Sequence, residues 1–445
     1  MSLEPKMRNT LYAALVVVAT LSAPPLSNAA EITLSEAFDY NAFILGDYTG
    51  YKSDVEGNLA VGGNLTVSDF DVGLQLAPDL TASSLYVGGD ISYVNGTIRN
   101  GQTTVSGDMV ATGVTFEGGI NADGSVLLTE SKVNEGDIFS GATVSLQSAE
   151  VVEGDVAASD LVQTNSSINK GDATLSQSAT LVNSEISNGT LTANSVSMDA
   201  DSTANSVSAI ATLSATTFET IDFDAIAAEV FAQSTAFGDM LINGTTTYYC
   251  AGETHCTADS VDGIVFSGND AINIYSIDAE ILSTGNKSIT YDFSTTSYNI
   301  INVTGDVVEL FNTGFYNTAF DGQYVDNDPG IDYRHDGTYT NNILFNFIEA
   351  TELNLYSVGV KGSILAPYAD VNFYNGHVDG NLIAASLSTP EVYLTNETGE
   401  TYLAPTGQIN NYSFGAIHVP EPASIAFLLS ASFLLLRRSR LECEA

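Results

Sequence analysis

Two short segments of the chain hold the residue types that could do chemistry. In the first, Cys250 and Cys256 enclose Ala-Gly-Glu-Thr-His, so two thiols and the imidazole of His255 lie close together in sequence. In an oxidising compartment this spacing favours a small loop closed by a Cys250–Cys256 disulfide. A metal site built on the two thiols and His255 is the alternative, but no fourth ligand is evident. The sequence therefore predicts the disulfide.

The second segment reads Asp332-Tyr333-Arg334-His335-Asp336 and could form a small acid–base or metal site. Hydrolysis of a polysaccharide needs a pair of carboxylates. Acidic residues occur throughout the chain, and no such pair stands out. The segment also lies in a Gly- and Asn-rich stretch, where solvent keeps each group near its ordinary behaviour. We interpret it as a solvated loop, and we predict no catalytic residue and no resident metal.

The charge balance restricts the partners. The chain has 12 Lys plus Arg against 54 Asp plus Glu, a formal net charge of −42. Nucleic acid is excluded as a partner because phosphate binding needs clustered basic residues, and an anionic membrane surface is disfavoured for the same reason. The carboxylates could collect Ca²⁺, or they could serve solubility alone. The sequence leaves both possibilities open and indicates no other cofactor.

The N-terminal segment, 1–30, has the layout of a secretory signal peptide. Lys6 and Arg8 precede an apolar stretch, Leu11 to Leu21, and small residues near Ala30 offer a cleavage site. The apolar stretch is short for a stable span, which needs about 20 residues. We therefore expect the chain to be exported and the mature protein to begin near Glu31.

The C-terminal segment, 419–445, forms a three-part tail. Pro420-Glu421-Pro422 is followed by an apolar run from Ala423 to Leu436, and then by Arg437-Arg438-Ser439-Arg440. The run is too short to cross a bilayer comfortably, and the arginines would stay on the cytoplasmic side. This tail resembles the PEP-CTERM sorting signal of Gram-negative bacteria. The resemblance implies transient inner-membrane anchoring, removal of the tail by an exosortase, release to the exterior or cell surface, and association with exopolysaccharide and biofilm matrix.

Between Val55 and Thr190 one small unit returns: an apolar residue, a spacer, Gly, and often Asp or Asn. Most successive glycines recur at a nearly constant spacing, and only the step from Gly107 to Gly119 breaks the period. A short fixed period with one turn per unit is typical of a β-solenoid. A β-sandwich or barrel with regular turns is the alternative. We expect stacked coils with their glycines along one edge: Gly89, Gly107, Gly136, Gly154, Gly171 and Gly189.

The remaining elements fit a mainly β fold, a solenoid with a capping helix and one flanking helix. Apolar spacing predicts a helix over 34–45, with Ser35 as its N-cap, covering an open end of the stack. A second helix is predicted over 221–231, along the flank and linking two β portions. Strands resume after Val261, a long loop is expected over 314–342, and the chain after Ser386 is expected to leave as a stalk.

Two stretches resemble the choice-of-anchor A domain of bacterial surface proteins. The first runs from Tyr40-Asn-Ala-Phe-Ile-Leu-Gly-Asp47 to Val61-Gly-Gly63-Asn64, and the second from Gly359-Val-Lys-Gly362 to Gly380-Asn381-Leu-Ile-Ala. Together they bracket most of the segment 31–418. The resemblance implies a β-helix-like extracellular domain with an adhesive or matrix role, and it supplies no catalytic residues.

These observations favour a non-catalytic adhesive or matrix protein, with exopolysaccharide or a cell-surface glycan as its partner and an exosortase acting during processing. The alternative is a polysaccharide lyase or hydrolase on a β-helix, for which the Asp332–Asp336 segment is the one local candidate. Binding to ice would need threonines at the same place in successive coils. Thr is frequent here but does not keep that register, so the sequence does not favour this function.

Overall fold

The computed structural model describes residues 32–417 except 210–217, 219, 251, 253–254, 319–339, 397, 405 and 416. Residues Leu34–Gly415 form one compact unit. The two ends of the chain form another, of which only Ile32, Thr33 and Ile417 are described; Ile32 and Ile417 pair there in an antiparallel bridge. The signal-peptide and sorting-signal predictions fall outside the described residues.

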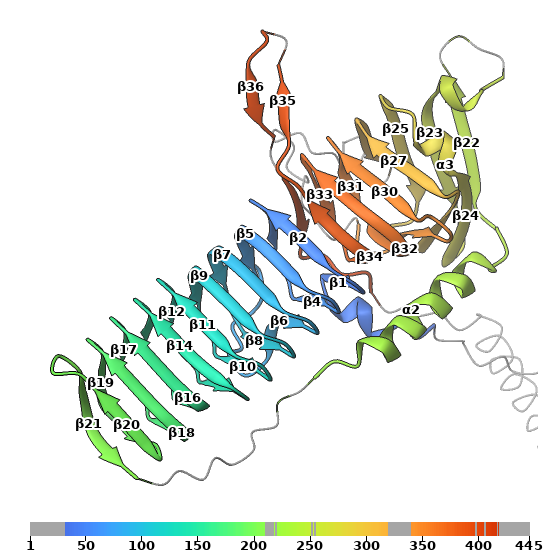
Figure 1. The fold of residues 1–445 in the computed structure, drawn as a ribbon. Helices are drawn as coiled ribbons and strands as arrows, with labels where there is room; N and C mark the ends of the chain where they lie inside the picture. The colour runs from blue at the N-terminus through green and yellow to red at the C-terminus, as the bar shows by residue number, and fades with distance from the viewer. Residues whose placement is uncertain are drawn as a thin grey trace, which may run out of the picture. The chain divides into compact units, whose positions relative to one another are not determined.

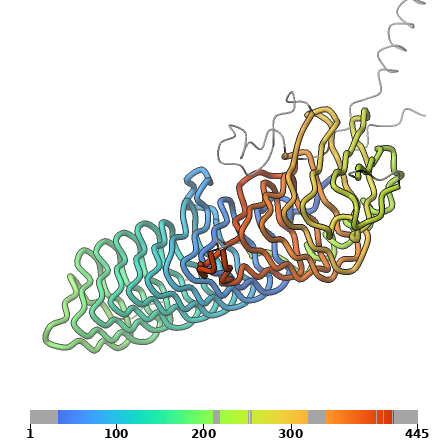
Figure 2. The backbone as a smooth tube through the Cα atoms, turned by 90° about the horizontal axis from the view of Figure 1, so that it is seen from above, coloured from blue at the N-terminus to red at the C-terminus, as the bar shows by residue number. Residues whose placement is uncertain are grey.

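The compact unit is a β-solenoid, which confirms the predicted fold class (Figures 1 and 2). Thirty-one strands join in one sheet, and the pairings between successive coils are parallel. Each coil adds a short stretch of strand to each of three faces, and long strands bend from one face to the next. The side chains alternate inward and outward, so Val, Ile, Leu and Phe from all three faces fill a single buried core.

In order along the stack, the first face consists of β24 (Ile272–Asp278), β26 (Tyr298–Thr304), β29 (Ile343–Phe347), β32 (Ser363–Tyr374), β34 (Leu382–Thr389), β1 (Ala42–Ile44), β4 (Leu59–Val61), β6 (Ser83–Val87), β8 (Gln102–Val105), β10 (Ile120–Ala122), β13 (Ile138–Ser140), β16 (Val156–Thr164) and β18 (Ala173–Val182).

The second face consists of β27 (Val307–Phe311), β30 (Glu352–Tyr356), the later parts of β32 and β34, β2 (Tyr48–Tyr51), β5 (Leu65–Val72), β7 (Ile91–Ile98), β9 (Met109–Phe116), β11 (Val126–Thr129), β14 (Thr143–Gln147), the later parts of β16 and β18, and β20 (Ser195–Met198).

The third face consists of β31 (Gly359–Lys361), β33 (Gly376–Asp379), β37 (Gly407–Asn410), β3 (Asp54–Val55), the ends of β5, β7 and β9, β12 (Lys132–Val133), β15 (Glu150–Val151), β17 (Ser167–Ile168), β19 (Glu185–Thr192) and β21 (Thr203–Ser208). A separate four-stranded sheet lies beside β31. It consists of β22 (Thr245–Cys250), β23 (Val261–Gly268), β25 (Lys287–Phe293) and β28 (Thr313–Asn317). The strands β35 (Tyr393–Thr395) and β36 (Thr401–Leu403) form a hairpin.

The order of coils in the stack differs from their order in the chain. Strand β1 pairs with β4 on one side and with β34 on the other. The first coil of the chain therefore lies in the interior of the stack. Coils are added from it as far as β21, and the second half of the chain adds coils that finish beside β1, where Figure 1 shows the blue and orange strands side by side.

The repeated Gly-Asp and Gly-Asn turns are explained by hydrogen bonds between successive coils. The Asp90 carboxylate accepts from the backbone N–H of Asp108 at 2.8 Å, and that of Asp155 accepts from the N–H of Asp172 at 2.7 Å. Equivalent bonds link Asp47 to Asn64, Asn64 to Asp90, Asp108 to Ser125, Asp137 to Asp155, and Asp172 to Thr190. An N–H that would otherwise lack a partner at the corner is thus satisfied by the preceding coil.

The glycines lie along two edges, so the prediction of one edge is wrong. Gly89 and Gly107 stack at the corner between the first and second faces, where the N–H of Gly107 bonds to the carbonyl of Gly89. The second row lies at the corner between the third and first faces and consists of Gly119, Gly136, Gly154, Gly171 and Gly189. The short step from Gly107 to Gly119 is the change from one corner to the other.

The first predicted helix is mostly wrong. Ser35 does cap a helix, but this is a single 3-10 turn, η1 (Glu36–Asp39), and Ala42–Ile44 are strand β1. The turn does not cover an open end: the amide of Asn381 donates to the carbonyls of Phe38 and Tyr40, which places it at the junction with the later coils. Residues Ala42–Ile44 form a strand despite the helical spacing of their apolar residues, because β4 and β34 pair with them on both sides.

The second predicted helix is confirmed as α2 (Phe223–Gly238), capped by Asp222. It lies along the first face and crosses the junction between the two halves of the stack. The ring of Phe223 contacts that of Phe43 at 5.5 Å, and the Ser234 hydroxyl donates to Asn346 at 2.7 Å. The short helices η2 (Ala258–Ser260) and α3 (Ala279–Leu282) complete the described elements.

Two loop predictions need correction. The stretch after Ser386 is not a stalk, because β34 continues to Thr389 and β37 returns to pair with β33 and β3. The expected loop 314–342 begins instead with the later part of β28, and most of the remainder lies outside the described residues. Strands predicted after Val261 are confirmed in β23 to β27 and in β29 to β32.

Candidate binding groove at a coil corner

The corner between the second and third faces places one residue of each coil in the left-handed backbone region. Its φ is 52° at Ser148, 53° at Asn165 and 46° at Asn183. Asparagine tolerates this region better than most residues because its short polar side chain can bond locally. Small polar residues therefore suit this corner, and they recur at the spacing of the coils in the three coils of Ser148, Asn165 and Asn183.

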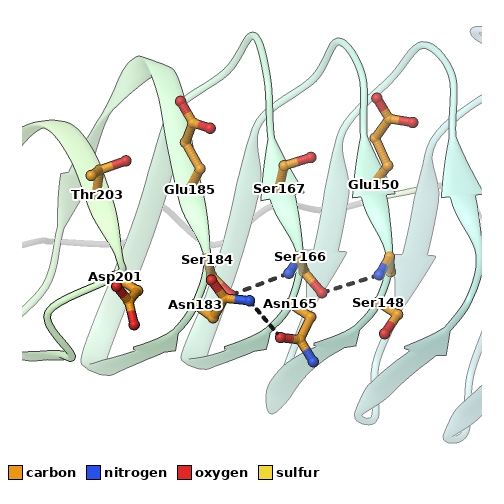
Figure 3. A pocket seen from close by; sticks show the side chains of 11 residues that line it. Ser148, Glu150, Asn165, Ser166, Ser167, Asn183, Ser184, Glu185, Asp201 and Thr203 are labelled. Carbon is orange, nitrogen blue, oxygen red and sulfur yellow. Dashed lines mark hydrogen bonds between the residues drawn. The ribbon is translucent and has the colours of Figure 1, made fainter.

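Directly after this position, a row of buried serines holds the corner in place. The N–H of Ser166 donates to the Ser184 hydroxyl at 3.2 Å (Figure 3). The N–H of Ser184 donates to the Ser202 hydroxyl at 3.1 Å. The N–H of Ala149 donates to Ser166 in the same way. Each coil is thereby fixed to the next, so the exposed residues beside the serines form a regular row.

Those exposed residues line a groove, hereafter the corner groove, with a cavity volume of about 630 Å³. Asn183 donates to Asn165 at 2.8 Å, so amide groups are linked across two coils (Figure 3). The other exposed or half-buried polar residues of the lining are Ser148, Glu150, Ser167, Glu185, Asp201 and Thr203. Amides, hydroxyls and carboxylates thus recur at the separation of about 4.8 Å between parallel strands, which suits the hydroxyl groups of an extended sugar chain.

The same corner carries aromatic rings in the second half of the stack. Phe311 and Tyr356 stack with ring centroids 4.7 Å apart, and Tyr356 and Tyr374 stack at 5.4 Å. All three are half-buried. Burial raises the pKa of Tyr356, and the Glu309 carboxylate raises it further. Since the rings cover one another's faces, they offer mainly their edges and the tyrosine hydroxyls to a ligand.

Carboxylates dominate the charge of the corner groove. Glu150 pairs with Lys132 at 3.5 Å, whereas Glu185 and Asp201 form no ion pair with a described residue and add negative charge. Within the part of the chain that the structure describes, no group of three or more His, Cys, Asp or Glu residues is arranged to hold a metal ion. The geometry therefore suits a neutral polymer better than a polyanion.

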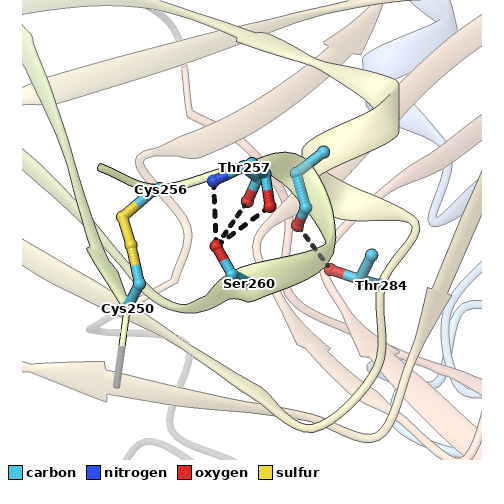
Figure 4. The surroundings of a disulfide bond; sticks show 6 residues. Cys250, Cys256, Thr257, Ser260 and Thr284 are labelled. Atoms are coloured by element: carbon cyan, nitrogen blue, oxygen red, sulfur yellow. Dashed lines mark hydrogen bonds between the residues drawn. A yellow bond between two sulfur atoms is a disulfide. The ribbon is translucent and has the colours of Figure 1, made fainter. Parts of the chain in front are cut away.

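The two segments singled out in the sequence lie away from this groove or outside the described residues. Cys250 and Cys256 are joined in a disulfide with their Cα atoms 5.7 Å apart, beside the helical turn in which Ser260 bonds to Thr257 (Figure 4). Asp332–Asp336 lies outside the described residues, as do Pro420, Glu421, Pro422, Arg437 and Arg438.

A buried polar cluster was not predicted. Lys361, His377 and Asp379 are buried on the outer side of the third face, opposite the core residues Val360 and Val378, and the Lys361 ammonium contacts both of the other side chains. Lys361 and Asp379 stand in the Val-Lys-Gly and Val-Asp-Gly units that the sequence shows as turn signals. The sequence carried little signal for the cluster, because other coils also place polar residues at the position of Lys361, among them Asp379, Asn410 and Glu56.

The coils and the corner groove define a class of protein, a parallel β-solenoid with regular rows of polar groups along its corners. The ice-binding-like adhesive domain family matches residues 33–125 and 102–394, and the chain belongs to this family. The family indicates an adhesive protein of the cell surface or exterior. No helix among the described residues is long and apolar enough to cross a membrane.

One solved structure, a crystal structure of an ice-binding protein from an Antarctic bacterium of the Flavobacteriaceae, is similar to this chain. The match covers 81% of this chain and 96% of that one, with 11% identical residues and a TM-score of 0.22. No curated protein sequence matches the chain.

Proposed function

We propose that this protein is a non-catalytic adhesin of the bacterial surface or biofilm matrix that binds exopolysaccharide or a cell-surface glycan along the corner groove. The observation that carries the proposal is the regular row of amide and hydroxyl groups at that corner, held by the buried serines. Solenoids offer extended surfaces on which many weak contacts add up. A neutral glycan fits the anionic lining directly, whereas an acidic one would need bridging Ca²⁺.

The proposal predicts that Asn165→Gly/Asn183→Gly weakens glycan binding about tenfold, because two hydrogen-bonding amides, each contributing about 0.5–1.5 kcal/mol, are removed. Glycine keeps the left-handed corner available, so the coils should persist. Binding of the mature protein to the host's exopolysaccharide and to neutral glycans would be measured by calorimetry, with and without Ca²⁺.

Gln177→Ala is the matched control. Gln177 is exposed, and its amide donates to the Ser159 hydroxyl at a corner away from the groove. The substitution should leave affinity unchanged. Equal affinity of the double variant and the wild-type protein would reject the corner groove as the binding site. Shortening of the glycan during the incubation would instead support the alternative, a lyase or hydrolase.

Ice is a second ligand to consider because of the family. The outward residues of the second face do not favour it. One outward row of that face reads Thr66, Ser92, Val110, Leu127, Ser145, Val162, Thr180 and Ser197. Only two of these residues are threonine, so the row has no constant spacing of hydroxyl and methyl groups. We therefore propose a glycan in preference to ice.

We further propose that the protein is exported by a Gram-negative cell, anchored transiently in the inner membrane, and released when an exosortase cuts near Pro420-Glu421-Pro422. The support is the short apolar run followed by basic residues. C-terminal mass spectrometry of the extracellular protein should find no peptide from the segment 423–436. Recovery of such peptides from the extracellular material would show that the tail is retained.

A further inference from the structure

We propose that Lys361 and Asp379 become joined by a covalent amide bond between their side chains, formed by the protein itself on the buried outer side of the third face. The two residues are direct neighbours in the sheet: Lys361 on β31 is in register with Asp379 on β33, which is in register with Asn410 on β37. The exposed fraction is 0% for Lys361 and Asp379 and 2% for Asn410. The amine and the carboxyl group are therefore held together and shielded from water.

The contacts give each atom of the pair a distinct role. The Lys361 Nζ atom lies 2.5 Å from Oδ2 of Asp379 and 3.0 Å from Nε2 of His377. The amide of Asn410 donates to the other carboxylate oxygen, Oδ1, at 2.5 Å. His377 Nε2 is also 3.8 Å from Oδ2. Asn410 thus polarises the oxygen that would remain as the amide carbonyl, while the imidazole lies between the amine and the oxygen that would leave.

The surroundings favour a neutral product. A buried ion pair loses the hydration of both charges, and mutual attraction repays this loss only in part. Condensation to an amide removes both charges at once. The flanking residues Val360, Val378 and Ile409 are buried, and the Tyr291 hydroxyl donates to the Lys361 carbonyl at 2.6 Å, which fixes the strand that carries the amine. Exclusion of water also opposes hydrolysis of the amide once formed.

The step balances without any further reagent. His377, with its proton on Nδ1, accepts a proton from the Lys361 ammonium at Nε2, and the neutral Nζ attacks Cγ of Asp379. The C–Oδ2 bond breaks while a new C–N bond forms. Oδ2 leaves with two protons from the amine, one of them delivered by His377, as one water molecule. His377 is regenerated, and no atom is oxidised or reduced.

Lys287 provides an internal comparison. It is also buried, with an exposed fraction of 4%, and burial lowers the pKa of its amine to about 8. Its Nζ atom donates to the carbonyls of Ile281 and Leu282 and to the Thr284 hydroxyl. None of these three partners is a carboxyl group, so Lys287 has no acceptor for condensation among them and should remain a free amine.

Peptide mass spectrometry of the purified full chain tests the proposal. After denaturation and reduction, cleavage at glutamate should release the peptide 353–391, which contains both Lys361 and Asp379 and no internal glutamate. We expect this peptide to be lighter than its sequence by one water molecule. Amine labelling of the denatured protein should modify Lys287 and leave Lys361 unmodified.

Asp379-Gly380 could also lose water by closing a succinimide ring, and trypsin separates the two products. The succinimide leaves the Lys361 amine free, so trypsin would cut after it; the proposed amide blocks that cut. The Lys361→Arg variant should give the peptide at its full mass. A full-mass wild-type peptide with a labelled Lys361 would overturn the proposal. A link from Lys361 to Asn410 with loss of ammonia would overturn the assignment of Asp379 as acceptor.

Discussion

Lys361→Met is expected to lower the free energy of unfolding by about 3–5 kcal/mol, because it leaves a lone buried carboxylate where the wild-type protein holds an ion pair or the amide proposed above. The substitution leaves the Asp379 carboxylate buried on the outer side of the third face, where its exposed fraction is 0%. Asn410 still donates to it, but a neutral amide does not replace the positive charge of the lost ammonium. The loss should be seen as a lower midpoint of urea unfolding followed by circular dichroism.

Two further variants show whether burial of the charge is the cause. Lys170→Met removes an exposed lysine that pairs with Glu153 at 3.0 Å, and it should change stability by less than about 1 kcal/mol. Lys361→Met/Asp379→Leu leaves neither buried charge behind and should be clearly more stable than Lys361→Met. If the double variant were as unstable as the single one, an uncompensated Asp379 carboxylate would not explain the effect.

Gly154→Ala is expected to destabilise the solenoid by about 2–5 kcal/mol, from backbone strain together with forced displacement of neighbouring atoms. Gly154 has a φ of 152°, and a Cβ atom placed on it would lie 2.0 Å from the carbonyl oxygen of Gly136. That oxygen cannot retreat freely, because Gly119 lies against Gly136 and Gly171 stacks on Gly154 in the same row. Urea unfolding measures the change.

The control for this row is Gly415→Ala. Its nearest non-neighbouring atom would be the Tyr298 hydroxyl oxygen at 4.0 Å, and its φ lies outside the left-handed region. The substitution should alter the unfolding midpoint little. A Gly154→Ala protein that unfolds at the wild-type midpoint would contradict this prediction. It would mean that neighbouring coils can move apart at this corner at little cost in free energy.

The local repeat could be predicted because its cause is local. At the two corners that carry glycines, an Asp or Asn after most of them accepts from an N–H of the next coil, so the same short unit returns there, and Asp90 and Asp155 both follow this rule. Which corner a glycine occupies could not be predicted. Gly107 and Gly136 have similar sequence surroundings, and only the pairing of their coils separates them.

Features that depend on distant segments were missed. Strand β1 reads as part of a helix until β34, which comes from near the other end of the chain, is placed beside it. The segment around Asn410 reads as a stalk because its Thr-, Asn- and Gly-rich surroundings hide that Asn410 is buried against Asp379. The corner groove could have been anticipated in part, since Ser148, Asn165 and Asn183 recur at the same spacing as the glycines of the repeat.

The position of β1 inside the stack has a consequence for how the protein is made. A chain that emerges from its N-terminus can wind the coils from β1 to β21 while the segment Leu382–Thr389 is still unmade. Throughout that time the outer edge of β1 presents unpaired N–H and C=O groups, the kind of edge on which strands of other chains add. Only the arrival of β34 covers it. The coil that is synthesised first is therefore among the last to have both of its edges paired. A chain that terminates before β34 keeps the edge of β1 exposed, where strands of other chains can pair with it and cause aggregation.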